Sequence, residues 1–120
     1  MNQPLHWYGS KWRLAPRIVA LMPPHSTYVE LFCGSCSVLL RKPPAAVEVA
    51  NDLDGEVVNF FRVLRDPPAL ARLVRMLELT PYSREEFAAC VPHQPGDWVW
   101  RAWRMAVAQN QSRNGKALHA

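Results

Sequence analysis

The sequence predicts an α/β fold in which parallel strands are flanked by helices and then followed by a helical segment. Residues 27–32 and 46–50 are short apolar runs rich in β-branched and aromatic side chains, as strands are. Gly34 interrupts the chain after the first run, and Asp52 follows the second. Strand, glycine turn, helix, and strand with a terminal acid is the order of a βαβ unit. We therefore expect a parallel pair of strands with a right-handed crossover.

Helices are predicted where apolar residues recur at helical spacing between turn or capping residues. Pro16 suits the first position of a short helix that continues through residues 17–22, since its missing N–H is no loss there. Ser35 or Ser37 can cap a helix through residues 38–41. Residues 56–64 place their apolar side chains on one face at helical spacing and predict an amphipathic helix.

The second half of the chain is typical of helices joined by short capped turns. Asp66 and the two prolines after it indicate a joint between helices, with a proline beginning the second. Ser83 with Glu86 three residues later is a capping-box pattern, and Asp97 can cap a last helix. These signals predict helices over residues 69–79, after Ser83 and over about 98–110, with a loop over 92–96 and a loose end over 111–120.

Length and composition are those of one globular domain with its own core. No apolar run approaches the roughly 18 residues that a membrane span needs. The first residues also lack the basic and apolar segments of a secretory signal, so we expect a cytoplasmic protein without membrane contact. The formal net charge of +4 is compatible with a polyanionic partner but does not by itself indicate one.

Cys33 and Cys36 form a CxxC motif, which raises the alternatives of zinc binding and of redox chemistry. The chain has three cysteines, no second CxxC and four scattered histidines. A structural zinc site needs four ligands at compatible spacing. The sequence therefore favours neither a metal site nor thioredoxin-like chemistry.

The turn at residues 32–36 (FCGSC) is the strongest candidate for a ligand site. Gly34 allows a ligand to approach the backbone closely, and the following backbone N–H groups can face it. Asp52 stands where an acid can accept both hydroxyls of an adenosine ribose. The alternative is that Asp52 only caps the next helix. The glycines do not form the dinucleotide pattern GxGxxG, so NAD is not favoured.

Three segments in order resemble the Dam-like (D12 class) DNA adenine N6-methyltransferase family. Residues 5–11 (LHWYGSK) resemble its opening LKWxGGK segment, and residues 28–39 (YVELFCGSCSVL) resemble its first cofactor motif, FxGxG or FxGxA. Residues 51–61 (NDLDGEVVNFF) are similar to the segment around its NDxN or NDLD core. Residues 79–87 (LTPYSREEF) also look like these enzymes. An ordered set of this kind is more specific than any one motif.

The resemblance implies a Rossmann-like fold that binds S-adenosyl-L-methionine and methylates adenine in double-stranded DNA. Residues 1–66 would be the cofactor-binding part, and residues 67–120 a helical segment leading toward the DNA-recognition region. Carried over by position, the cofactor-binding residues would be Trp7, Lys11, Glu30, Phe32, Cys33, Gly34, Ser35 and Asp52. Core packing for Trp7 and a solvated charge for Lys11 are the competing interpretations.

Three departures from the family pattern bear on function. Ser10 and Cys36 stand where relatives carry glycine, or alanine in the case of position 36. If position 36 needs a positive φ, its cysteine costs about 1–2 kcal/mol and we expect weakened cofactor binding. The DPPY-type motif that polarises the flipped adenine is absent, so no catalytic residue is assigned. Asp66-Pro67-Pro68-Ala69 lacks the aromatic residue and follows a helix.

Arg101, Arg104, Arg113 and Lys116 accompany three tryptophans in the region where DNA recognition begins in the family. Such side chains can contact phosphates, but a buried amphipathic helix over residues 98–110 is favoured, which leaves DNA contact to the tail. The sequence thus predicts a truncated methyltransferase. The alternatives are a non-catalytic cofactor-binding module or one part of a split enzyme completed by another polypeptide, and a small DNA-binding protein.

Overall fold

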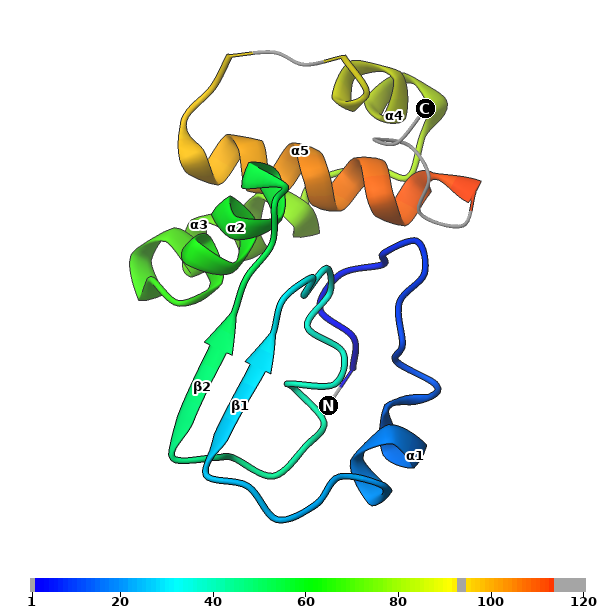
Figure 1. The fold of residues 1–120 in the computed structure, drawn as a ribbon. Coiled ribbons are helices and arrows are strands. Elements are labelled where there is room, and N and C mark those ends of the chain that lie inside the picture. The colour runs from blue at the N-terminus through cyan, green and yellow to red at the C-terminus, as the bar shows by residue number, and fades with distance from the viewer. Residues whose placement is uncertain (1, 93–94, 114–120) are drawn as a thin grey trace.

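A computed structural model describes residues 2–92 and 95–113, in which a parallel two-stranded sheet lies beside a group of helices (Figure 1). The strands and the first helix occupy the lower half of the view, and the later helices the upper half. This arrangement confirms the predicted α/β class with parallel strands followed by a helical segment. The elements of the described part are α1 (Ala15–Ala20), β1 (Thr27–Glu30), β2 (Val47–Ala50), α2 (Gly55–Leu64), α3 (Pro67–Glu78), α4 (Arg84–Cys90) and α5 (Trp98–Gln111).

The two strands pair in parallel from Thr27 opposite Val47 to Glu30 opposite Ala50. β1 ends two residues earlier than the predicted strand over residues 27–32. The hydrogen bonds nevertheless continue beyond it, because Asn51 N donates to Glu30 O at 2.8 Å and Cys33 N donates to Asn51 O at 2.9 Å. The glycine turn is thereby held beside the residues that follow β2.

The predicted helix over residues 38–41 is wrong, since the structure forms a series of turns there. Leu40 N donates to Cys36 O at 2.9 Å and Lys42 N donates to Val38 O at 3.0 Å, so helix-like bonds begin but do not propagate. The prolines at 43 and 44 have no N–H to donate, so the helical hydrogen bonds cannot continue. A single helical turn is costly to form when no further turns follow it. The connection between the strands is therefore a compact turn.

The capping residues of the second half act as predicted. Asp66 accepts a hydrogen bond from Ala69 N at 2.9 Å, and α3 begins at Pro67. Ser83 Oγ accepts from the Glu86 amide at 3.1 Å, and Asp97 accepts from the Trp100 amide at 2.9 Å. The same observations confirm the joint between helices at Asp66 and the last helix behind Asp97. α1 begins one residue before its predicted start at Pro16 and keeps this proline in its first turn.

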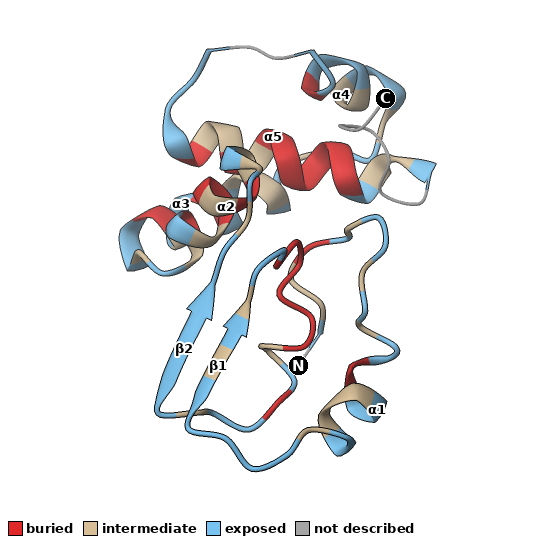
Figure 2. Cartoon of the chain, viewed as in Figure 1, coloured by how far each residue is buried: buried red, intermediate tan, exposed pale blue. Residues whose placement is uncertain are grey.

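The core lies mainly among the helices, with α5 at its centre (Figure 2). α5 contacts α2, α3 and α4, and residues 104–109 are all buried, because neighbours surround this part of the helix on several sides. Leu5 is fully buried and joins the same core as Val57 and Met105, which ties the N-terminal segment to the helices. None of the helices in the described residues is long and apolar enough to cross a membrane.

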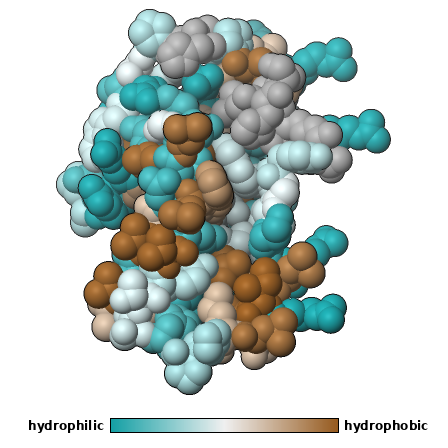
Figure 3. All heavy atoms as spheres, viewed as in Figure 1, coloured by the Kyte–Doolittle hydropathy of each residue, from teal (hydrophilic) through white to brown (hydrophobic). Residues whose placement is uncertain are grey.

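The sheet is far less covered than the helices. All four residues of β2 are exposed, and apolar Val47 and Val49 are among them (Figure 2). Figure 3 shows hydrophobic residues at the surface in the lower half of the molecule, which holds the strands, as well as in the upper half. α2 contacts α3 and α5 and therefore packs with the other helices. The predicted division of the chain into a cofactor-binding part ending at residue 66 and a helical segment beginning at residue 67 stays a prediction.

Candidate cofactor-binding site

The turn after β1 has a left-handed backbone at two positions. Gly34 has a φ of +48° and Cys36 a φ of +52°. Within the described ranges, Cys36 is the sole residue other than glycine with a positive φ. Position 36 therefore does need the conformation that glycine adopts freely and that other residues adopt at a cost of about 1–2 kcal/mol.

Asp52 meets this turn from the end of β2. Its Oδ2 accepts a hydrogen bond from Gly34 N at 2.7 Å, and its Oδ1 accepts from Asp54 N at 3.0 Å. The helix-capping alternative does not apply to Asp52, because Asp54 is the residue that caps α2, accepting from Glu56 N at 2.8 Å. The turn after β1 and the acid after β2 are thus in direct contact, although the segment between the two strands forms turns and not the predicted helix.

A cavity of about 620 Å³ opens between residues 7–11 and this turn. Ligand pockets for small molecules commonly hold about 300–1,000 Å³. All of the predicted cofactor-binding residues line it, together with four that were not predicted. The lining residues are Trp7, Tyr8, Gly9, Ser10, Lys11, Glu30, Phe32, Cys33, Gly34, Ser35, Ser37 and Asp52. Tyr8, Gly9, Ser10 and Ser37 are the ones missed, although they lie inside the segments that carried the family resemblance.

Trp7 closes one side of the cavity against the turn. A Cβ atom added to Gly34 would lie 2.8 Å from Trp7 Cδ1, which is closer than real contacts allow. Lys11 approaches from the same segment, and its Nζ donates to Gly9 O at 2.7 Å. Trp7 packs against the hydrophobic core and Lys11 is exposed, as the competing interpretations expected. Both residues nevertheless line the cavity.

Two carboxylates, Glu30 and Asp52, and one ammonium group, that of Lys11, line the cavity. Glu30 Oε2 accepts from Leu39 N at 3.1 Å, and burial raises the pKa of this carboxyl. Carboxylates accept hydrogen bonds from hydroxyls or ammonium groups and favour a cationic ligand. The ammonium of Lys11 can pair with a carboxylate of the same ligand.

Cys33 lines this cavity, whereas Cys36 faces a neighbouring cavity of about 460 Å³ that also reaches Cys33 and Asp52. Burial raises the pKa of both thiols, so they stay protonated near neutral pH and lack the thiolate that redox chemistry needs. All three cysteines are free. Among the described residues, no group of His, Cys, Asp and Glu side chains is arranged to hold a metal ion.

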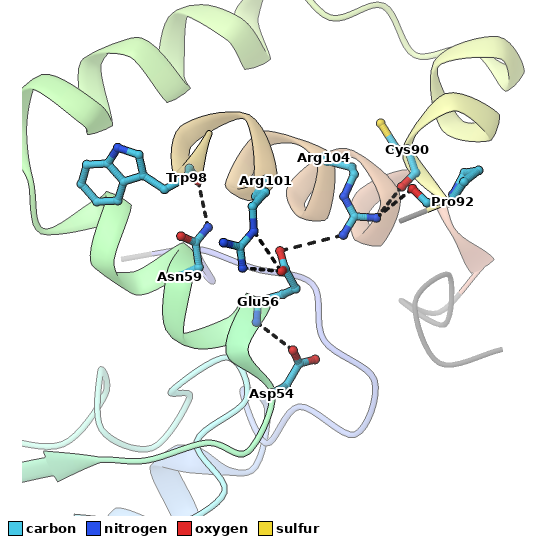
Figure 4. Close-up of polar contacts among 8 residues, drawn as sticks. All are labelled: Asp54, Glu56, Asn59, Cys90, Pro92, Trp98, Arg101 and Arg104. Atoms are coloured by element: carbon cyan, nitrogen blue, oxygen red, sulfur yellow. Dashed lines mark hydrogen bonds and ion pairs between the residues drawn. The ribbon is translucent and has the colours of Figure 1, made fainter. Parts of the chain in front are cut away.

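The two arginines of α5 make their contacts within the helical group, in agreement with the favoured interpretation of residues 98–110 as a buried helix (Figure 4). Arg101 donates to Glu56 Oε1 from Nε at 3.1 Å and from Nη2 at 2.5 Å. Arg104 is buried, with Nη1 donating to Cys90 O at 3.0 Å and to Pro92 O at 3.3 Å. Its Nη2 lies 3.9 Å from Glu56 Oε2. Arg113 is exposed, and Lys116 lies outside the described residues.

The parallel strands, the glycine turn and the acid-lined cavity lie together within residues 7–52. The sequence model of the D12 class N6 adenine-specific DNA methyltransferases matches residues 7–94, which is most of the chain and all of the cavity lining. The chain belongs to this family.

A curated relative agrees with that assignment. The Type II methyltransferase M1.LlaDCHI of Lactococcus lactis subsp. cremoris is 32% identical over 80 residues, covering 66% of this chain and 26% of the relative. The chain thus spans about a quarter of that relative's length. No solved structure matches the chain.

Proposed function

We propose that this chain binds S-adenosyl-L-methionine in the 620 Å³ cavity and supplies the methyl-donor site of a DNA adenine N6-methyltransferase with a Rossmann-like sheet. One observation carries the proposal. Segments around residues 7–11, 30–35 and 52, separated widely in sequence, converge on a single cavity. They are the segments that resemble the family's cofactor motifs, and the two carboxylates and one ammonium group in the lining support a charged nucleoside as the ligand.

Each side chain has a role that follows from its place. Asp52 would accept the ribose hydroxyls, and its orientation is already set by the Gly34 amide at 2.7 Å. Lys11 and Glu30 would pair with the carboxylate and ammonium of the methionine part, and Trp7 would exclude water over the turn. The cofactor supplies a methyl group that passes directly from its sulfonium to the adenine amine. The contribution of these residues is to bind and orient the donor.

The groups that activate adenine would come from polypeptide beyond these 120 residues. The sequence contains no DPPY-type motif, and Asp66, the nearest resemblance to one, caps α3. The exposed apolar face of β2 supports such a complement, because a two-stranded sheet is marginal alone and apolar sheet faces are normally covered. We propose that this chain alone does not methylate DNA and that a complementing segment or polypeptide adds strands to the sheet.

Double-stranded DNA is the proposed substrate of the completed enzyme, with a restriction–modification role like that named for the Lactococcus relative and a cytoplasmic location. A non-catalytic cofactor-binding module is the second candidate. It is favoured because all of the predicted cofactor-binding residues line the cavity while the sequence has no DPPY-type motif. A small DNA-binding protein would have to use its basic tail, since Arg101 and Arg104 are engaged inside the helical group.

Calorimetric titration of the purified chain with S-adenosyl-L-methionine tests the proposal. We expect saturable binding that weakens about tenfold or more in Asp52→Ala, because hydrogen bonds to a charged group are worth about 1.5–3 kcal/mol. Asp66→Ala is the matched control, since it removes an acid that caps a helix away from the cavity. Absence of binding by the folded chain, or equal weakening in both variants, would contradict the proposed site. Methylation of DNA by the chain alone would contradict its proposed incompleteness.

A further inference from the structure

Three serine hydroxyls from two distant segments form a closed triangle at the wall of the cavity. Ser10 Oγ lies 2.8 Å from Ser37 Oγ, Ser35 Oγ lies 2.7 Å from Ser37 Oγ, and Ser35 Oγ donates to Ser10 Oγ at 3.1 Å. Ser35 and Ser37 are almost completely buried, at 2% and 3% exposure. Ser10 comes from the opening segment, 25 residues before Ser35. Such a triangle is expensive to bury unless each hydroxyl is satisfied.

The direction of each hydrogen bond follows from the single proton that each hydroxyl owns. Ser35 gives its proton to Ser10. The bond between Ser35 and Ser37 must then be donated by Ser37, and the bond between Ser10 and Ser37 must be donated by Ser10. The three bonds therefore run in one direction around the ring, so removing any one hydroxyl breaks two of the three bonds and leaves a single bond between the remaining pair.

Ser10 is also the point at which the opening segment is held together. Its Oγ accepts from Gln3 Nε2 at 2.8 Å and from Trp12 N at 3.3 Å, in addition to its two bonds in the ring. Its own amide donates to Trp7 O at 3.0 Å. The residue that closes the ring thus lies three positions after Trp7 and directly before Lys11, which both line the cavity.

We propose that Ser10 is a positioning residue, and that the ring of Ser10, Ser35 and Ser37 fixes residues 7–11 against the glycine turn so that Trp7 and Lys11 face the cavity before the cofactor arrives. This inference rests on the proposed function for its ligand, but the ring itself belongs to the empty protein. Preorganisation of this kind raises affinity by removing the cost of ordering a segment on binding.

Amide hydrogen exchange of the unliganded chain tests the ring without any ligand. Ser37→Ala should accelerate exchange at Ser10 and Trp12, more than twenty residues away in sequence, about three- to tenfold, as expected for the loss of one neutral hydrogen bond. Ser10→Ala should in turn accelerate hydrogen exchange at the amides of residues 36–42. Because the two variants probe the ring from opposite sides, the test stays decisive if one of them folds poorly. Ser112→Ala, which removes a 3.0 Å hydroxyl bond on the far helix, is the control and should leave both regions unchanged.

Cofactor titration then separates positioning from direct contact. Ser10→Ala and Ser37→Ala should each weaken S-adenosyl-L-methionine binding about three- to tenfold, the double variant should be no weaker than the worse single one, and Ser10→Thr should restore binding. Additive losses, or unchanged exchange across the ring, would overturn the proposal. A third outcome is that the serine variants change hydrogen exchange as predicted but the wild-type chain binds no cofactor. The ring would then be real, but the proposed function would have failed, and the positioning role would be overturned with it.

Discussion

The backbone amide of Gly34 donates a 2.7 Å hydrogen bond to Oδ2 of Asp52, so the turn after the first strand and the acid after the second are one unit. This contact orients the carboxylate that would hold the ribose and fixes the turn that would admit the cofactor. It also explains why a short, exposed sheet still presents a defined cavity, because the pairing of β1 and β2 places the two residues side by side.

Gly34→Ala should damage the site more than its backbone conformation alone predicts. A φ of +48° costs an alanine about 1–2 kcal/mol, and the new Cβ would also lie 2.8 Å from Trp7 Cδ1, so the indole must move. Gly9→Ala is the matched control, with a φ of +77° and nothing within 4 Å of the new atom. Urea unfolding should show the larger loss for Gly34→Ala, and equal losses would rule out the contact with Trp7.

Cys36→Gly and Cys36→Ala should differ in stability although both remove the same sulfur. Only glycine relieves the φ of +52°, a gain of about 1–2 kcal/mol, partly offset by the roughly 0.5–1 kcal/mol of extra entropy that glycine loses on folding. We expect the glycine variant to be the more stable of the two by up to about 1 kcal/mol in chemical denaturation, and to bind cofactor more tightly than wild type. An alanine variant that matches or exceeds it would show that the turn is unstrained.

Glu56→Ala should destabilise the helical group strongly. It removes the partner of Arg101 and the nearest carboxylate to the buried Arg104, and a hydrogen bond to a charged group is worth about 1.5–3 kcal/mol. Arg72→Ala serves for comparison, because its pair with Asp97 is about half exposed and exposed pairs contribute about 1 kcal/mol or less. Thermal unfolding that ranks Arg72→Ala as the worse variant would contradict the role of the network.

The stability of the chain should carry a pH dependence that belongs to Glu30. Burial raises the pKa of this carboxyl in the folded state, so its contribution to stability is fully present below the unfolded pKa, about 4.3, and is lost as pH rises through the folded value. Glu30→Gln keeps an acceptor for Leu39 N and does not titrate. The free energy of unfolding of wild type minus that of the variant should therefore fall across this window, and a flat difference would refute a half-buried Glu30 that ionises with a raised pKa.

Much of the architecture could be predicted because the signals for it are local. Three helix starts are each indicated by a capping residue and the residues next to it, and all three residues cap as expected. They are Asp66 before two prolines, Ser83 three residues before Glu86, and Asp97 before an apolar run. The cavity lining could be predicted because the family resemblance covers those segments. The turn at residues 38–41 could not, since its sequence permits a helix and the left-handed Cys36 and the prolines at 43 and 44 prevent one.

The pairings that cross the molecule could not be predicted either. Arg101 and Glu56 are 45 residues apart, and nothing in either segment indicates which carboxylate neutralises which guanidinium. The same is true of Leu5, which looks like part of a loop and is fully buried among the helices. Ser10 was visible only as a departure from glycine, and its bonds to Ser35 and Ser37 emerge once the turn is folded against it.

The most direct test of the central claim is an amide NMR titration of the isotope-labelled chain with S-adenosyl-L-methionine. Saturable shifts concentrated at residues 7–11, 30–37 and 52, with little change in α3 and α4, are the predicted result. A folded chain whose spectrum does not change, or whose shifts gather in the neighbouring cavity of Val58, Phe61 and Arg62, would contradict the assignment of this cavity to the methyl donor.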